Sequence, residues 1–180
     1  MDEAIIDAVL DLLSDGVTVE ALSMEAVAAR AGVGKAAIYR RWAHKIALVV
    51  DAVAAAKEPM PPLRGESMRD DLVTLTRAIG KARDSRAGQI LPCLMPELQR
   101  QGELRSQYLE MIEERRDVAR EVLRRGIATG ELRPDTDVEL AVIMLSGTMV
   151  MTLLGSAPRL DTDNLAERLV DTVLRGIEAR

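Results

Sequence analysis

The sequence predicts an all-α protein, and three observations support that prediction. Hydrophobic residues make up 48% of the 180 residues, but Phe is missing, and there are only one Trp and two Tyr. A core of Leu, Val, Ala, Ile and Met suits helices better than sheets, which favour aromatic and β-branched residues. Apolar residues also recur at three- and four-residue spacing, and no stretch alternates as a half-buried strand would.

The N-terminal part of the chain is expected to hold four short helices, over residues 2–14, 24–31, 35–42 and 44–56. Ile5, Val9 and Leu12 lie on one face of the first helix, which Gly16 can end. Ser23 is placed to cap the second helix. Gly32 then begins a tight turn into the third helix, where only glycine accepts a positive φ without steric cost. The pattern predicts a three-helix, helix-turn-helix domain over residues 1–46.

The segment Glu58–Arg64 holds three prolines and marks the best boundary or bend in the chain, because no helix interior tolerates them. Five further helices are expected over residues 67–84, 87–100, 103–129, 135–155 and 162–179. Pro92 and Pro96 should kink the second of these or reset its start. Residues 47–180 therefore form a second helical domain in this prediction.

Composition disfavours several classes of protein. The single Cys93 cannot form an internal disulfide, and the chain has no cysteine cluster for a metal. One His, one Cys and no Gly-rich phosphate loop leave no nucleophile–base pair, so neither an enzyme nor a cofactor is expected. The acidic N-terminus lacks a secretion signal, which favours the cytoplasm. The uncharged stretch Leu140–Pro158 approaches the length of a membrane span. Its Ser, Thr and Gly residues favour a helix buried in the core or shared between subunits instead.

The most informative stretch is Ser23–Lys45, a basic two-helix module in a chain whose net charge is −5. From Ala26 to Val50 there is no Asp or Glu, while five cations are present: Arg30, Lys35, Arg40, Arg41 and Lys45. Phosphate binding uses Lys and Arg and is opposed by carboxylates, so double-stranded DNA is the expected partner. The alternative is an ordinary solvated basic helix.

The second helix of this module has two distinct faces. Ile38 and Trp42, four residues apart, should anchor it on the core. The opposite face then presents Lys35, Ala36, Tyr39 and Arg40. In helix-turn-helix proteins the N-terminal part of this helix enters the major groove, where Lys and Arg read guanine and Ala can contact a thymine methyl.

The stretch AVAARAGVGKAAIYRRWAHKIALV resembles the DNA-binding signature of the tetracycline-repressor (TetR) family of bacterial transcription regulators. The resemblance covers about Ile5 to Val53 and implies a ligand-responsive repressor that binds a palindromic operator. It implies that Lys35, Ala36 and Arg40 face bases and that Tyr39, Arg41 and Lys45 approach phosphates. Ser23 would cap the second helix beside the backbone, and His44 would lie next to the phosphate-binding start of the fourth helix. Gly34 and Ala37 stand where the family often has hydroxyl residues, so some phosphate hydrogen bonds should be missing.

A homodimer is expected, because one such module contacts only a few base pairs. The final helix carries an apolar ladder at four-residue spacing, and Gly147 would let the preceding helix approach a neighbour closely. The expected interface residues are Leu140, Met144, Gly147, Met151, Leu165, Leu169, Val173 and Ile177. The alternative is that both helices bury these faces within one subunit.

The middle helices are expected to bind an apolar small molecule, since Met adapts to irregular cavities. The candidate residues are Leu91, Met95, Tyr108, Met111, Arg115 and Met144. Arg115 falls on the apolar face of its helix and must therefore be paired or reach water. It could bind an anionic group of a ligand or pair with a carboxylate such as Glu97, and the methionines could instead be core filling. A rival interpretation is a helical dimer that binds small molecules or proteins and has lost DNA binding.

Overall fold

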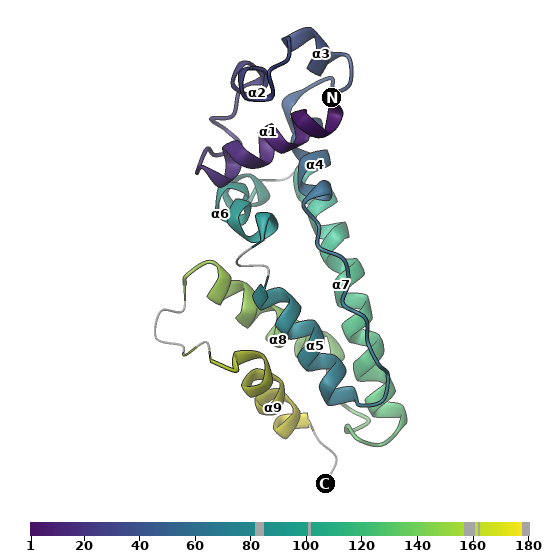
Figure 1. Ribbon diagram of the computed structural model, residues 1–180. Helices are drawn as coiled ribbons and strands as arrows, with labels where there is room; N and C mark the ends of the chain where they lie inside the picture. The colour runs from purple at the N-terminus through teal and green to yellow at the C-terminus, as the bar shows by residue number, and fades with distance from the viewer. Residues whose placement is uncertain (82–84, 101, 157–160, 162, 178–180) are drawn as a thin grey trace. The chain divides into compact units, whose positions relative to one another are not determined.

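The computed structural model describes residues 1–81, 85–100, 102–156, 161 and 163–177 (Figure 1). These residues form helices and no strand, which confirms the all-α prediction. The helices are α1 (Asp2–Ser14), α2 (Met24–Ala31), α3 (Lys35–Tyr39), α4 (Lys45–Ala55), α5 (Met68–Lys81), α6 (Arg86–Leu98), α7 (Glu103–Ala128), α8 (Val138–Leu153) and α9 (Leu165–Ile177).

Helices α1 and α2 begin and end where the sequence predicts. Helix α3 ends at Tyr39 rather than near Trp42, because the N–H groups of both Arg41 and Trp42 donate to the carbonyl of Ile38 at 2.9 Å. Two donors on one carbonyl tighten and end the helix. The expected ends of the helices at 84 and at 162–179 fall partly outside the described residues.

Helix α6 includes both of its prolines, so the later start that the sequence allowed is wrong, and the kink stays a prediction. A proline within a helix leaves the carbonyl four residues earlier without its donor. Pro92 and Pro96 lie on the exposed side of α6, whereas Gly88, whose carbonyl Pro92 leaves without a donor, is buried. The helix nevertheless extends from Arg86 to Leu98.

The chain divides into two compact units. The N-terminal unit is Met1–Glu58 with Asp84–Ile112, and the C-terminal unit is Pro59–Arg83 with Glu113–Arg180. The N-terminal unit thus contains α1 to α4 together with α6, and α6 packs against α1. Its core is aliphatic, with fully buried Ile5, Val9, Leu13, Ile38 and Leu48.

In the C-terminal unit α5 packs against both α8 and α9. Buried Leu72, Leu123, Leu132 and Val170 belong to one apolar cluster there. Asp71 is also buried, at 3% exposure, and its Oδ2 accepts a hydrogen bond of 2.5 Å from Nη2 of Arg125.

Burial alone would raise the pKa of Asp71. Hydrogen bonds from Arg125 and from the backbone of Gly65 and Arg64 outweigh that effect and lower the pKa. The ionised carboxylate thereby joins α5 to α7 and to the segment that precedes α5.

The start of α8 is set by a cap and an ion-pair network. Asp137 Oδ1 accepts from the N–H of Leu140 at 2.9 Å, so α8 begins at Val138 rather than near residue 135. Arg120 donates to Glu139 from two nitrogens, at 2.7 and 2.9 Å, and this contact joins α7 to α8.

Within the described residues, no helix combines the length and the apolar character that crossing a membrane requires.

Candidate nucleic-acid interface

The turn between α2 and α3 is built by local backbone chemistry. Oγ of Ser23 accepts from the N–H of Ala26 at 3.1 Å, which caps α2 as the sequence predicts. Gly32 has φ +68° and ends α2 in the left-handed conformation. The N–H of Val33 then bonds to the carbonyl of Ala28 at 3.0 Å. These bonds fix the angle at which α3 leaves α2.

Helix α3 is anchored on one side and exposed on the other. Ile38 is fully buried and Trp42 is 4% exposed. Nε1 of Trp42 also donates to Oδ2 of Asp51 on α4 at 2.8 Å, which ties the end of the module to the next helix. The predicted DNA-facing residues Lys35, Ala36, Tyr39, Arg40 and Arg41 are all exposed, and Ala37 is half-buried. Lys35, Ala36, Tyr39 and Arg40 share one exposed face at helical spacing, opposite buried Ile38.

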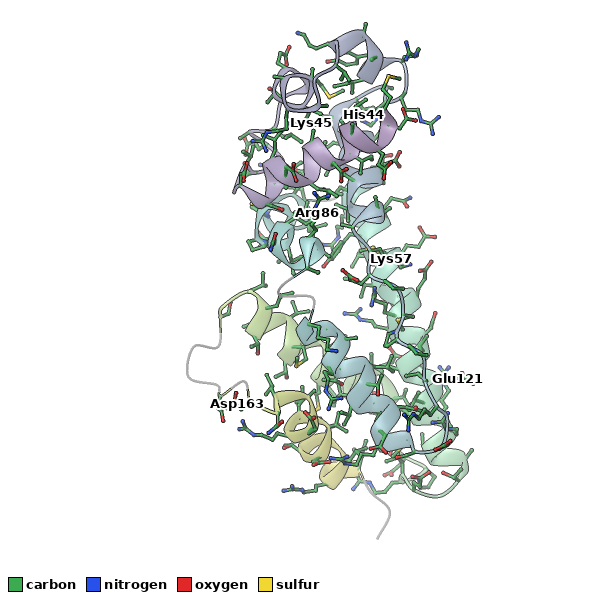
Figure 2. All side chains as sticks on the ribbon, in the orientation of Figure 1. His44, Lys45, Lys57, Arg86, Glu121 and Asp163 are labelled. Atoms are coloured by element: carbon green, nitrogen blue, oxygen red, sulfur yellow. The ribbon has the colours of Figure 1, made fainter. Side chains whose placement is uncertain are left out.

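The start of α4 lies next to that surface, and Figure 2 labels His44 and Lys45 there. Nδ1 of His44 accepts from the N–H of Ala47 at 3.2 Å, so this side chain is the N-cap of α4. Nζ of Lys45 donates to the backbone carbonyl of Glu20 at 2.9 Å. His44 therefore has a structural role, as the cap of α4, that sequence reasoning missed. Its position just before a helix was the signal that could have indicated this role.

Two cations of this surface, Lys35 and Arg41, have acidic neighbours within the same unit. Lys35 forms an ion pair with Glu25 on α2. That hydrogen bond lowers the pKa of Glu25 and raises the pKa of Lys35. Nε of Arg41 lies 3.4 Å from Oδ2 of Asp2. Sequence reasoning missed these carboxylates because it examined the acid-free window, and Glu25 is the residue just before it.

The predicted ligand-binding residues are divided between the two units. Leu91, Met95, Tyr108 and Met111 belong to the N-terminal unit, and Arg115 and Met144 belong to the C-terminal unit. Leu91 is buried, whereas Met95, Tyr108 and Met111 are half-buried. Nη1 of Arg115 lies 3.8 Å from Sδ of Met60. Glu97 was the suggested partner of Arg115, but its Oε2 lies 3.5 Å from Nη1 of Arg100.

The predicted dimer residues fall into two groups. On α9, Leu165 and Val173 are buried, and Leu169 and Ile177 are half-buried against the apolar cluster that contains Val173. That ladder is therefore used within the subunit, which is the alternative that the sequence left open for this helix. On α8, Leu140, Met144 and Met151 are 55%, 45% and 50% exposed, and Gly147 is half-buried. Ile143, which the sequence did not single out, is 45% exposed on the same side.

Comparison with known proteins agrees with this arrangement of helices. Residues 5–52 match the family described as bacterial regulatory proteins, tetR family, and residues 62–173 match the tetracyclin repressor-like C-terminal domain. The chain is similar to the uncharacterized HTH-type transcriptional regulator YdeS of Bacillus subtilis (strain 168). The identity is 30%, over 98% of this chain and 89% of that protein.

Two solved structures share the fold over nearly the whole chain. The transcriptional regulator FadR from Bacillus subtilis, in complex with stearoyl-CoA, has a TM-score of 0.74 at 19% identity and covers 99% of this chain and 100% of its own. NalD, the secondary repressor of the MexAB-OprM multidrug efflux pump in Pseudomonas aeruginosa, has a TM-score of 0.70 at 20% identity. The match covers 98% of this chain and 96% of that one.

Proposed function

This chain belongs to the TetR family of bacterial regulatory proteins, and we propose that it is a cytoplasmic, homodimeric repressor that releases a palindromic DNA operator when it binds a small apolar ligand. It is a DNA-binding transcriptional regulator, and members of this family are generally transcription factors rather than enzymes. In the proposal, residues 1–46 bind DNA and residues 47–180 bind the ligand and the second subunit. The observation that carries the proposal is the exposed, cationic face of α3, whose opposite side is held on the core by buried Ile38 and Trp42.

The proposed DNA contacts follow from that face. Lys35 and Arg40 would donate to guanine O6 and N7 in the major groove, and the methyl of Ala36 would contact thymine. Tyr39, Arg41 and Lys45 would approach phosphates, and the capped starts of α2 and α4 would turn backbone N–H groups toward them. Buried Ile38 and Trp42 would keep α3 fixed while it enters the groove.

The proposed dimer rests on α8. Leu140, Ile143, Met144 and Met151 recur at helical spacing and leave one apolar stripe exposed. Gly147 lies within this stripe, and a Cβ built there would meet no other described atom within 4 Å. Glycine inside a helix costs about 1 kcal/mol relative to alanine, and packing within the subunit does not require it. Close approach of a second α8 would explain it.

Two copies joined in this way could place their α3 helices one turn of DNA apart. Successive major grooves on one side of the duplex lie about 34 Å apart, so a two-fold symmetric dimer reads a palindrome. Each module alone contacts only a few base pairs. Dimerisation is therefore what would give the protein a useful specificity.

The proposed sensor uses the helices that follow the DNA-binding part. FadR from Bacillus subtilis was solved with stearoyl-CoA, and a largely apolar ligand would also suit the methionine-rich helices here. Helix α6 is suited to carry the response, because it belongs to the N-terminal unit. Arg86, labelled in Figure 2, pairs with Asp7 and, at 3.0 Å, with Asp11 on α1. A ligand that prefers a shifted α6 would weaken operator binding by its differential affinity for the two states.

Selection of bound sequences from a pool of random DNA would test the proposal. Enrichment of a palindrome whose half-sites lie about one helical turn apart is the expected result. Enrichment without two-fold symmetry would overturn the dimeric part. Absence of binding at low salt would overturn the repressor and favour the rival, a helical dimer that has lost DNA binding.

A further inference from the structure

We propose that Glu25 is an internal competitor of DNA, holding Lys35 in an ion pair that must break before this lysine can contact an operator. This inference rests on the proposed DNA-binding function and assigns a residue that limits its affinity. Glu25 lies in the first turn of α2, and Lys35 is the first residue of α3. The carboxylate accepts a hydrogen bond from the lysine ammonium across the helix-turn-helix angle.

Both partners are accessible to an approaching duplex. The side chains of Lys35 and Glu25 are 50% and 63% exposed. The surface that can present the ammonium to DNA therefore also presents the carboxylate. A phosphate or a guanine would have to replace Glu25 as the partner of Lys35, and the released carboxylate would then repel the phosphates nearby.

Arg40 provides an internal contrast on the same surface. Among the described residues, no carboxylate pairs with Arg40. Arg40 can therefore contact DNA without giving up a partner, whereas Lys35 cannot. By sequence alone, Lys35 and Arg40 would be expected to contribute similarly to DNA binding. The ion pair with Glu25 makes the net contribution of Lys35 to DNA affinity smaller than that of Arg40.

The position of Lys35 favours this pair in the free protein. A cation in the first turn of a helix is opposed by the positive end of the helix dipole, and a neighbouring carboxylate offsets that repulsion. The exposed pair adds little to folding stability, since such pairs are weak in water. Removing the carboxylate should therefore change DNA binding far more than it changes folding.

The test compares four proteins on two duplexes, the operator enriched from random DNA and a random-sequence duplex of equal length. The proteins are the wild type, Glu25→Gln, Lys35→Gln and the double variant. Glu25→Gln should tighten binding to both duplexes by up to about fivefold, the range that weak exposed pairs allow. It should also steepen the dependence of log affinity on log salt by up to about 0.9, the value for one further cation–phosphate contact.

The Lys35→Gln background separates competition from a general charge effect. There, Glu25→Gln should change affinity no more than Glu3→Gln does, a control that removes one exposed carboxylate of α1 in the same unit. Equal tightening by Glu25→Gln with and without Lys35 would overturn the inference. So would weaker binding or a changed base preference at one position, since Glu25 would then itself read a base. If the wild type binds neither duplex, the proposed function fails rather than this inference.

Discussion

Enlarging the side chain at Gly147 should affect folding and self-association in opposite directions. In an isolated subunit Gly147→Ala should stabilise α8 by about 1 kcal/mol, because alanine is the better helix former and its Cβ would meet no described atom within 4 Å. A dimer with two α8 helices in contact at this position would instead be overpacked. Overpacking costs about 1–3 kcal/mol per site, and the two-fold axis applies that cost twice.

The expected loss for Gly147→Leu is therefore about 2–6 kcal/mol of dimer stability, from the overpacking at two sites. Since 1.4 kcal/mol is about a tenfold change in affinity, the dissociation constant should rise at least about thirtyfold. Sedimentation velocity over a dilution series measures this directly, with Gly147→Ala as the smaller step of the series. A Gly147→Leu protein that dimerises as tightly as the wild type would refute the reasoning.

Three further predictions concern folding, each measured as the free energy of unfolding by chemical denaturation. Asp71→Asn should lose about 1.5–3 kcal/mol at pH 7, the usual worth of a hydrogen bond to a charged group. Because the folded-state pKa of Asp71 is lowered, the pair with Arg125 stabilises above the ordinary aspartate value of 3.8. Its contribution disappears as pH falls through the folded-state pKa, so variant and wild type should converge in acid and a constant difference would contradict this. Ser23→Ala should lower the free energy of unfolding by about 1 kcal/mol, because it removes the cap of α2. Ser23→Thr keeps the hydroxyl and should retain most of that stability. An equal loss in both variants would count against the cap. Trp42→Phe should cost about 1 kcal/mol through its lost bond to Asp51, and no loss would mean that this bond does not hold α4.

Much of the fold could be predicted from the sequence, because capping residues and apolar spacing determine where helices begin and end and which side is buried. Ser23 and Gly32 are residue types that cap and end helices, and they do so here. Apolar spacing placed Ile38 and Trp42 in the core of the N-terminal unit. The prolines of α6 were a poor guide to its start, because the helix Arg86–Leu98 includes both of them.

The exposed surfaces were harder to predict, because an apolar helix face can pack either on the core of its own subunit or on a partner. The ladder of α9 and the uncharged run of α8 both looked suitable for a partner. The structure buries Leu165 and Val173 within the subunit and leaves Leu140 and Met151 exposed. The pair of Lys35 with Glu25 was also missed, because Glu25 lies just before the acid-free window and no local pattern joins residues ten positions apart.

The most direct test of the account is the affinity of the full chain for its selected operator after the charges of α3 are reversed. Lys35→Glu combined with Arg40→Glu should abolish binding in a fluorescence anisotropy titration at moderate salt, because the proposal places both cations in the groove and phosphate contact dominates affinity. Lys81→Glu combined with Arg124→Glu changes the net charge equally on exposed residues of the C-terminal unit and should retain most of the affinity. Undiminished operator binding by the α3 variant would contradict the account.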